Sequence, residues 1–191
     1  SAPMVLCLKA RKSRSLPGLS KMKNFIVVTG GAGFVGSNLI ELLLKKTKYK
    51  IISLDNYSSG SQKNHILNKR VIYTKGNTLD INKILKKYEK KIVSIFHFGE
   101  FARIFQSFKK FDECYQSNSI GSKAVFKFCL DNKIKLIYSA TSASLGNRGS
   151  DKNLSPYAFT KAKNLELLEN LKKWFNFKFE VIFFYNVYGP K

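Results

Sequence analysis

The sequence predicts one doubly wound α/β domain, in which a parallel sheet carries helices on both faces. Short apolar runs rich in β-branched residues alternate with longer amphipathic stretches, as in successive βαβ units. The 191 residues suffice for one substantial core and are too few for two full domains. Hydrophobic residues make up 44% and aromatic residues 14% of the chain, which is a composition that folds.

The expected strands and helices follow one another along the chain. Phe25–Thr29 is a short apolar run closed by glycines, which is typical of a buried parallel strand, and Phe34–Lys46 has apolar residues at helical spacing. The other expected strands are residues 50–54, 71–74, 92–98, 134–139 and 179–185, and the other expected helices are residues 81–88, 112–130 and 156–175. Within 112–130 the residues expected to face the core are Ile120, Ala124, Val125 and Phe128.

The first 21 residues differ in composition from the rest. They contain five basic residues and no acid, and the apolar stretch at residues 5–8 is too short for a signal-peptide core. We interpret residues 1–21 as a non-native or flexible extension upstream of a natural start at Met22, with a targeting segment as the alternative. The domain is therefore expected at residues 22–191.

The chain is strongly basic, with 34 Lys and Arg against 12 Asp and Glu and a net charge of +22. Such a charge suits a polyanionic partner, such as RNA or DNA, or an anionic membrane surface. However, the lysines are scattered along the whole chain and form no run of five or six like charges. We therefore favour lysines on solvated faces over nucleic-acid binding, while an anionic small substrate would also suit this surface.

Cysteine and histidine usage points to a reducing compartment. Three cysteines without a CxxC spacing disfavour both a disulfide framework and a zinc site, and His65 and His97 are too far apart in sequence to suggest a metal cluster. No apolar run approaches the roughly 20 residues that span a bilayer. We expect a cytoplasmic protein with no bound metal and no membrane segment.

A glycine-rich segment, residues 29–36 (TGGAGFVG), lies between the first expected strand and helix. Gly30 permits a tight turn, Gly33 lets the backbone approach a pyrophosphate, and Gly36 lets helix and strand pack closely. The N–H groups at the start of the following helix favour phosphate binding. Asp55 stands 19 residues after Gly36, where a carboxylate binds the adenosine ribose hydroxyls and repels a 2′-phosphate. The segment therefore predicts a Rossmann domain that binds NAD.

Tyr157 and Lys161 are four residues apart in the expected helix 156–175, so they share one helical face. A phenol has a pKa of about 10 and is a poor base at neutral pH, whereas a neighbouring ammonium group favours the phenolate. The spacing thus suits proton transfer by a tyrosine. By itself, the same spacing is also compatible with an aromatic residue and a lysine on a surface helix.

Taken together, the ordered motifs resemble the extended short-chain dehydrogenases/reductases, in particular the nucleotide-sugar epimerase/dehydratase family with its UDP-glucose 4-epimerase-like members. The motifs are TGGAGFVGSN, SLDNYSSG, IFHFGE, SNSIGS, YSATSASLGN, SPYAFTK and FYNVYGP, and the resemblance runs from about residue 24 to residue 190.

The resemblance implies roles for individual residues. Tyr157 would be the general base and acid, Lys161 would bind the nicotinamide ribose, and Thr141 would hydrogen-bond the reacting sugar oxygen. Ser142 and Asn186 would also contact the substrate. With the glycine turn and Asp55, the residues expected to bind NAD are Gly30, Gly33, Phe34, Val35, Gly36, Asp55, Asn56, Asn77, Thr78, Phe98, Gly99, Asn118, Ser139, Tyr157, Lys161 and Tyr185.

Several positions depart from the family pattern. Asn77 stands where an aspartate near the adenine is common, and Glu100 stands where small apolar residues are usual. Ser142 and Ala143 replace the acid pair of the sugar 4,6-dehydratases, which disfavours dehydration. The resemblance also implies that His97 is a buried structural residue.

The resemblance implies an NAD-dependent nucleotide-sugar epimerase, with a homodimer as its expected assembly. It also implies that the C-terminal region that closes over the nucleotide-sugar is largely absent from this chain. The alternatives are a non-catalytic or nucleic-acid-binding member of the superfamily and a nucleotide-sugar dehydratase or reductase.

Overall fold

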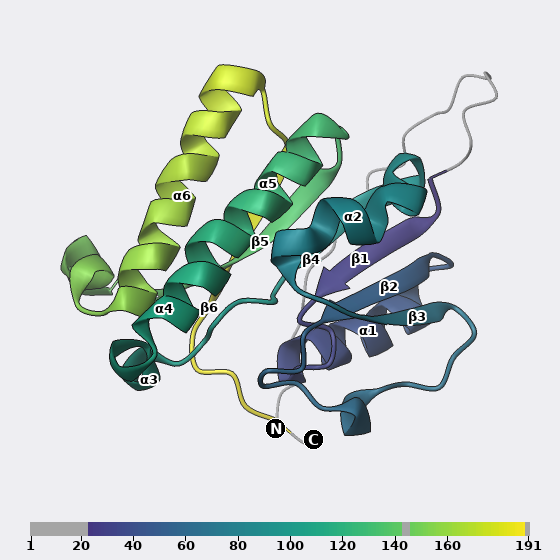
Figure 1. Cartoon of the computed structure of the whole chain (residues 1–191), viewed down its shortest axis with the longest axis horizontal. Coiled ribbons are helices and arrows are strands. Elements are labelled where there is room, and N and C mark those ends of the chain that lie inside the picture. Colours follow the sequence, from purple (N-terminus) through teal and green to yellow (C-terminus); the bar gives the residue numbers. More distant parts are fainter. Residues whose placement is uncertain (1–22, 143–145, 190–191) are drawn as a thin grey trace.

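The computed structural model describes residues 23–142 and 146–189, so the expectation for residues 1–21 falls outside the described residues. Six parallel strands form one sheet in the order β3-β2-β1-β4-β5-β6 (Figure 1). The strands are β1 (Phe25–Thr29), β2 (Lys50–Asp55), β3 (Val71–Lys75), β4 (Ile92–His97), β5 (Lys135–Thr141) and β6 (Phe179–Phe184). The helices are α1 (Phe34–Lys46), α2 (Ile81–Leu85), α3 (Ile104–Lys109), α4 (Phe111–Tyr115), α5 (Ser122–Asp131) and α6 (Pro156–Phe175).

Alternate residues of the buried strands point to opposite faces of the sheet, and each face has its own core. Ile26 and Val28 of β1 pack with Leu39 and Leu43 of α1 on one face. Val27, between them, belongs to the core on the other face. That second core is covered by α2, α5 and α6 (Figure 1). The predicted doubly wound α/β fold is therefore confirmed.

The strand order places a crossover point between β1 and β4. From β1 the chain continues outward through β2 and β3, and it then returns to β4 on the other side of β1 before continuing to β5 and β6. The connections after β1 and β4 therefore leave the sheet on opposite sides. In open α/β sheets such a crevice at the carboxyl ends of the strands is where ligands bind.

The expected long helix over residues 112–130 is present, but its middle section is not α-helical. Helices α4 and α5 are joined by a π-helical segment, Gln116–Gly121. The wider turn carries the fully buried Asn118, whose side chain bonds the backbone of Phe101. The same turn leaves Ile120 39% exposed, so the expectation that Ile120 faces the core is wrong, whereas Val125 and Phe128 are fully buried as expected.

Other differences concern element ends and one helix that was not expected. Helix α2 ends at Leu85 and is followed by 3₁₀ turns, whereas the sequence predicts a helix to residue 88. Helix α3 exposes Ile104, Phe105 and Phe108, so its apolar residues do not mark a buried face. Strand β5 continues to Thr141, two residues beyond the expected end.

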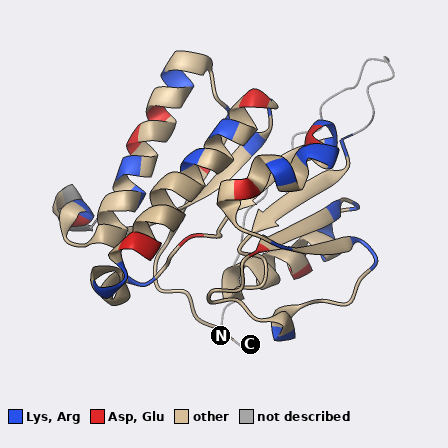
Figure 2. Ribbon diagram, viewed as in Figure 1, with Lys and Arg blue, Asp and Glu red and all other residues tan. Residues whose placement is uncertain are grey.

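The basic residues are distributed over the whole fold. Figure 2 shows lysines and arginines on α2, α5 and α6 and near the ends of several strands, with acidic residues among them. Five of the ion pairs in the described part join a lysine to an acid three or four residues away in sequence. Within residues 23–142 and 146–189 no helix has the length and apolarity needed to cross a membrane.

Candidate active site

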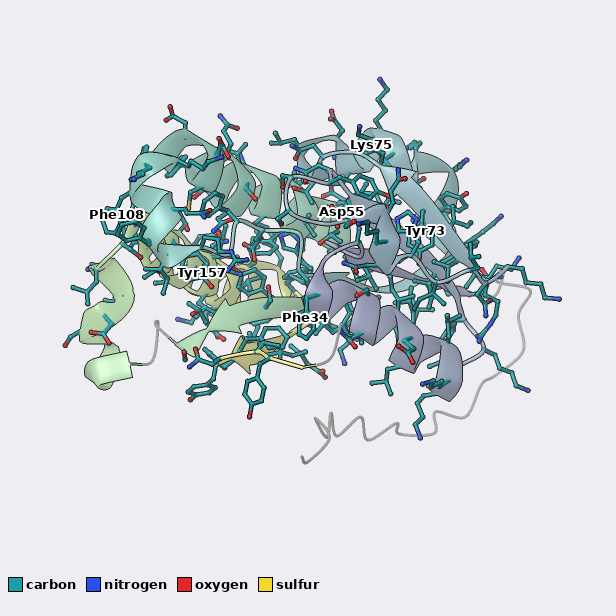
Figure 3. The ribbon with its side chains drawn as sticks, turned by 90° about the horizontal axis from the view of Figure 1, so that it is seen from below. Phe34, Asp55, Tyr73, Lys75, Phe108 and Tyr157 are labelled. Carbon is teal, nitrogen blue, oxygen red and sulfur yellow. The ribbon has the colours of Figure 1, made fainter. Side chains whose placement is uncertain are left out.

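The expected site residues gather at the carboxyl edge of the sheet. Phe34 follows β1, Asp55 ends β2, and Tyr157 lies in the first turn of α6, which follows β5. Figure 3, seen from below relative to Figure 1, labels these three residues along the edge. Segments that are distant in sequence therefore contribute to one region.

The turn between β1 and α1 brings two backbone segments into close contact. Gly30 has a φ of 70°, and a Cβ there would lie 2.8 Å from the backbone nitrogen of Gly99, which follows β4. A Cβ on Gly36 would lie only 2.1 Å from the carbonyl oxygen of Gly30. Both positions therefore require glycine, and helix α1 begins directly against the turn.

Helix α1 begins with its N-terminal N–H groups available for an anion. Its N-cap, Gly33, has no side chain and makes no side-chain capping bond. Phe34 and Val35 occupy the first turn and are half-buried. Backbone N–H groups and the positive end of the helix dipole make such a terminus a site for phosphate groups.

Asp55 connects the end of β2 to this turn. Its Oδ2 accepts a hydrogen bond from the backbone N–H of Ala32 at 2.9 Å, and its Oδ1 accepts from the backbone N–H of Tyr57 at 2.8 Å. The residue is 8% exposed, while the next residue, Asn56, is exposed. The carboxylate has remaining lone pairs that can accept hydroxyl groups of a ligand.

The residues after β3 and β4 complete one half of the carboxyl edge, which also contains the glycine-rich turn and Asp55. Asn77 caps the 3₁₀ turn Thr78–Asp80 by accepting a hydrogen bond from Leu79, and the buried Thr78 contacts the π-helical segment at Gly121. Phe98 and Gly99 both donate backbone N–H bonds to Thr29 Oγ1, at 3.1 and 3.0 Å, so the end of β4 is held against β1.

The other half of the edge is formed by β5 and α6. Ser155 caps α6 by accepting a 3.0 Å hydrogen bond from Ala158, and Pro156 occupies the first turn. Tyr157 is half-buried, and Thr141 is buried at the last position of β5. Ser142 follows Thr141 and is half-buried.

Lys161 is buried and turns toward the sheet. Its Nζ donates to Glu100 Oε2, to the carbonyl oxygen of Ser139 at 2.6 Å and to Ser139 Oγ at 3.2 Å. The Lys161 and Glu100 side chains are only 4% and 2% exposed. All three N–H bonds of the ammonium group thus have acceptors within the protein.

Glu100 accepts hydrogen bonds from several elements. Apart from Lys161, its donors are Ser122 Oγ at 2.7 Å and Tyr138 OH at 3.1 Å, and Asn164 Nδ2 lies 3.2 Å away. The single hydroxyl hydrogen of Ser139 goes to the His97 carbonyl oxygen at 2.9 Å. Burial alone would raise the pKa of Glu100, but the charge of Lys161, with the hydrogen bonds from Lys161 and Ser122, holds it below its ordinary value. The carboxylate is therefore ionised and fully solvated by protein groups.

Asn164 is a contributor to the site that the sequence analysis missed. The two hydrogens of its amide nitrogen have their shortest acceptors at the Asn118 carbonyl oxygen, 2.6 Å away, and Tyr138 OH, 3.0 Å away, while Glu100 Oε1 is the longest contact at 3.2 Å. Asn164 lies three residues after Lys161 and seven after Tyr157, so helical spacing places it on the same face. That spacing is the pattern that could have identified it.

His97 continues the network toward the glycine turn and is fully buried, as the resemblance implies. Because Ser122 gives its only hydroxyl hydrogen to Glu100, it accepts from His97 Nε2 at 2.9 Å. His97 Nδ1 then accepts from Thr29 Oγ1 at 2.8 Å. Burial lowers the pKa of His97 to about 4, so the ring is neutral at pH 7.

The remaining expected residues fall into two groups. Asn118 is buried and forms two hydrogen bonds with the backbone of Phe101, at 2.7 and 3.0 Å, which fixes the segment after β4. Tyr185 and Asn186 follow β6 and are exposed, with Tyr185 71% exposed. The structure therefore brings Asn118 into the buried network and leaves Tyr185 and Asn186 outside it.

Comparison with known proteins agrees with this arrangement. The family model described as "NAD dependent epimerase/dehydratase family" matches residues 26–191. The chain therefore belongs to the NAD-dependent epimerase/dehydratase family.

Individual relatives show how much of such a protein the chain covers. It is 30% identical to a dTDP-D-glucose 4,6-dehydratase of Dictyostelium discoideum, over 87% of the chain and 44% of that protein. It is 28% identical to an uncharacterized UDP-glucose epimerase of Bacillus subtilis, over 87% and 57%. The chain thus spans about half the length of the curated relatives it matches.

A solved structure of an epimerase has a similar fold and is also covered only in part. The UDP-glucose 4-epimerase of Thermotoga maritima, crystallised with UDP-glucose, superposes with a TM-score of 0.77 at 27% identity. The superposition covers 87% of this chain and 57% of the epimerase.

The close contact at Gly36 predicts a large effect of one methyl group. We expect Gly36→Ala to lower the free energy of unfolding by about 2 kcal/mol, because a Cβ cannot fit against the Gly30 carbonyl. The measurement is chemical denaturation. The control is Gly33→Ala, where the nearest atom to the new Cβ is 3.2 Å away and the change should stay within about 1 kcal/mol. Equal losses in both variants would contradict this account.

Burial of neutral His97 predicts a pH-dependent stability. Between the unfolded pKa of about 6.5 and the folded pKa of about 4, the unfolded chain binds a proton that the folded chain does not. The contribution is therefore fully present above pH 6.5 and is lost as the pH falls to 4, by about 3 kcal/mol. Urea denaturation across this range should show a steeper loss for the wild type than for His97→Gln. Identical slopes would show that His97 is not the group responsible.

Proposed function

We propose that this chain supplies the NAD-binding and proton-transfer part of a nucleotide-sugar epimerase. The observation that carries the proposal is the placement of Tyr157 at the carboxyl edge of a sheet whose β1–β4 crevice already carries a dinucleotide-type glycine turn. Membership of the NAD-dependent epimerase/dehydratase family supports the same assignment.

The residues of the crevice fit NAD. Gly33, the N-cap of α1, has no side chain, so none covers the first N–H groups of the helix, where a pyrophosphate would bind. Asp55 lies at the end of β2, where its carboxylate can bind ribose hydroxyls and disfavours a 2′-phosphate. Phe98 and Gly99 continue the crevice along the end of β4.

The chemistry divides between the cofactor and the protein. When bound, NAD supplies reversible hydride transfer at a sugar carbon. Tyr157 takes the proton from the hydroxyl group on that carbon and later returns it, while Thr141 hydrogen-bonds the same oxygen. Lys161 is one helical turn beyond Tyr157 on the same face of α6.

Epimerisation is favoured over dehydration by the residues after β5. Elimination of water from a sugar needs an additional acid and base, and Ser142 and Ala143 follow Thr141 instead. Ala143 lies outside the described residues. The matched dehydratase and epimerase relatives are compatible with either reaction class.

Replacement of Tyr157 by phenylalanine tests this proposal. We expect Tyr157→Phe to lower turnover of UDP-glucose by 10²-fold or more, because the proton acceptor is removed. NAD affinity, measured by calorimetry, should stay within about three-fold of the wild type, which distinguishes lost chemistry from lost binding. The assay uses the complete protein that contains this chain. Full turnover by the variant would refute the assigned role.

The net charge of +22 favours a second candidate function, which is nucleic-acid binding. The spread of lysines over many elements in Figure 2 argues against a binding surface on one helix or strand. A steeply salt-dependent affinity for RNA, together with no detectable NAD binding, would favour this second function over the first.

A further inference from the structure

Although the lysines belong to many elements, the parallel sheet brings one set of them together at its amino edge. All six strands run in the same direction, so the residues before each strand meet at the edge opposite the candidate active site, away from the arrowheads in Figure 1. One exposed lysine stands at or shortly before the start of every strand. In sheet order from β3 to β6 these residues, which we call the lysine row, are Lys69, Lys50, Lys23, Lys90, Lys133 and Lys178.

Backbone hydrogen bonds hold the segments of the lysine row side by side. The N–H of Lys50 donates to the Asn24 carbonyl oxygen at 2.9 Å, and the N–H of Asn24 donates to the Lys91 carbonyl oxygen at 2.8 Å. Toward the other end of the sheet, the N–H of Leu136 donates to the Lys178 carbonyl oxygen at 3.1 Å. Because neighbouring strands lie about 4.8 Å apart, the lysine row is about 24 Å long.

Neighbouring acids do not neutralise the charge of the lysine row. The acids beside these segments, Glu89, Asp131 and Glu180, each pair with a lysine outside the row, at 3.2, 2.6 and 2.5 Å. Among residues 23–142 and 146–189, no lysine of the row forms an ion pair. The row is therefore a line of exposed cations.

Exposed aromatic side chains stand next to the lysine row at two places. Tyr49 directly precedes Lys50 and is 37% exposed. Trp174 and Phe175, at the end of α6 and shortly before Lys178, are 63% and 57% exposed. Contacts of cationic side chains with the backbone and stacking of bases on aromatic rings are the means by which proteins hold single-stranded nucleic acid without reading its sequence.

We propose that the amino edge of the sheet binds single-stranded nucleic acid, with the lysine row along its phosphates and Trp174 stacked on a base. A line of cations matches the regular charge of a nucleic-acid backbone. A membrane surface is typically bound by the apolar face of an amphipathic helix, whereas the described part of this edge consists of strand starts and helix ends. The edge lies opposite the candidate active site, so the inference is independent of the proposed NAD site and gives the second candidate function a location on the molecule.

The salt dependence of binding tests the role of the lysine row. We expect the protein to bind a fluorescein-labelled oligouridylate of about 12 nucleotides, measured by fluorescence anisotropy. The slope of log K against log salt concentration should be about −4, because each of six neutralised phosphates contributes about −0.7. The triple variant Lys23→Gln/Lys50→Gln/Lys90→Gln should bind about ten-fold or more weakly, with a slope of about −2.

A second triple variant with the same loss of charge is the matched control. Lys63, Lys75 and Lys109 are exposed and lie at or beyond the carboxyl ends of β2, β3 and β4. Their replacement by glutamine should leave the slope unchanged and the affinity within about three-fold of the wild type, because these charges are separated from the row by more than a screening length. Equal losses in the two triple variants would show attraction to the overall charge of the protein and would overturn the inference.

Replacement of Trp174 tests the stacking contact separately. Trp174→Ala should lower the affinity for the oligouridylate by about ten-fold without a change in the salt slope, because it removes a stacking surface and no charge. The control is Phe108→Ala on α3, which removes a side chain that is 59% exposed beyond the carboxyl end of β4 and should leave the affinity unchanged. An unchanged affinity of Trp174→Ala would refute the stacking contact.

The remaining outcomes separate this inference from its alternatives and from the proposed function. Binding to phosphatidylserine vesicles without binding to the oligouridylate would assign the edge to a membrane surface and would overturn the inference. Absence of both would show that these lysines only complement the negative ends of the neighbouring helices. NAD affinity of the Lys23/Lys50/Lys90 variant, measured by calorimetry, should stay within about three-fold of the wild type. Absence of NAD binding by the wild type would refute the proposed NAD site and leave this inference standing.

Discussion

A directed series of hydrogen bonds joins the glycine-rich turn to helix α6. Thr29, which precedes Gly30, donates to His97, His97 donates to Ser122, and Ser122 donates to Glu100, which binds Lys161. Each group in the series has one orientation that satisfies both of its neighbours. The series therefore fixes β1, β4, α5 and α6 relative to one another, and with them the two halves of the candidate site.

The two halves of the candidate site are stabilised by different kinds of contact. The turn after β1 depends on backbone contacts at Gly30 and Gly36, where any side chain would collide with main-chain atoms. The half next to α6 depends on polar side chains, chiefly Glu100 and Lys161, that are buried and satisfy one another. The first half is therefore sensitive to added volume, and the second is sensitive to a change of charge or of hydrogen-bonding group.

Much of the fold was predictable because its signals are local. The apolar run Phe25–Thr29 and the glycines after it specify a buried strand and a tight turn within a few residues. The π-helical segment Gln116–Gly121 was not predictable in this way, because it depends on Asn118 meeting Phe101, 17 residues away. Helix α3 was not predicted because its apolar residues are exposed and give no amphipathic pattern.

In the candidate site, too, some features have a local sequence signal and others depend on residues far apart in the chain. The spacing of Tyr157 and Lys161 is visible in one helical turn, whereas the partner of Lys161 is 61 residues earlier in the chain. Glu100 stood out in the sequence only as an unusual acid after β4. Its place in the network depends on the packing of β4, β5, α5 and α6 against one another, and no pattern along a single segment contains that information.

Asp55 links two properties that protein engineers usually treat as separate. Its carboxylate oxygens hold the backbone of Ala32 and Tyr57, so the same side chain that we propose binds ribose hydroxyl groups also shapes the loop around it. An exchange of cofactor preference by replacing this acid would therefore also release the loop. Any redesign at this position has to provide a new anchor for the two amide groups before it provides a new specificity.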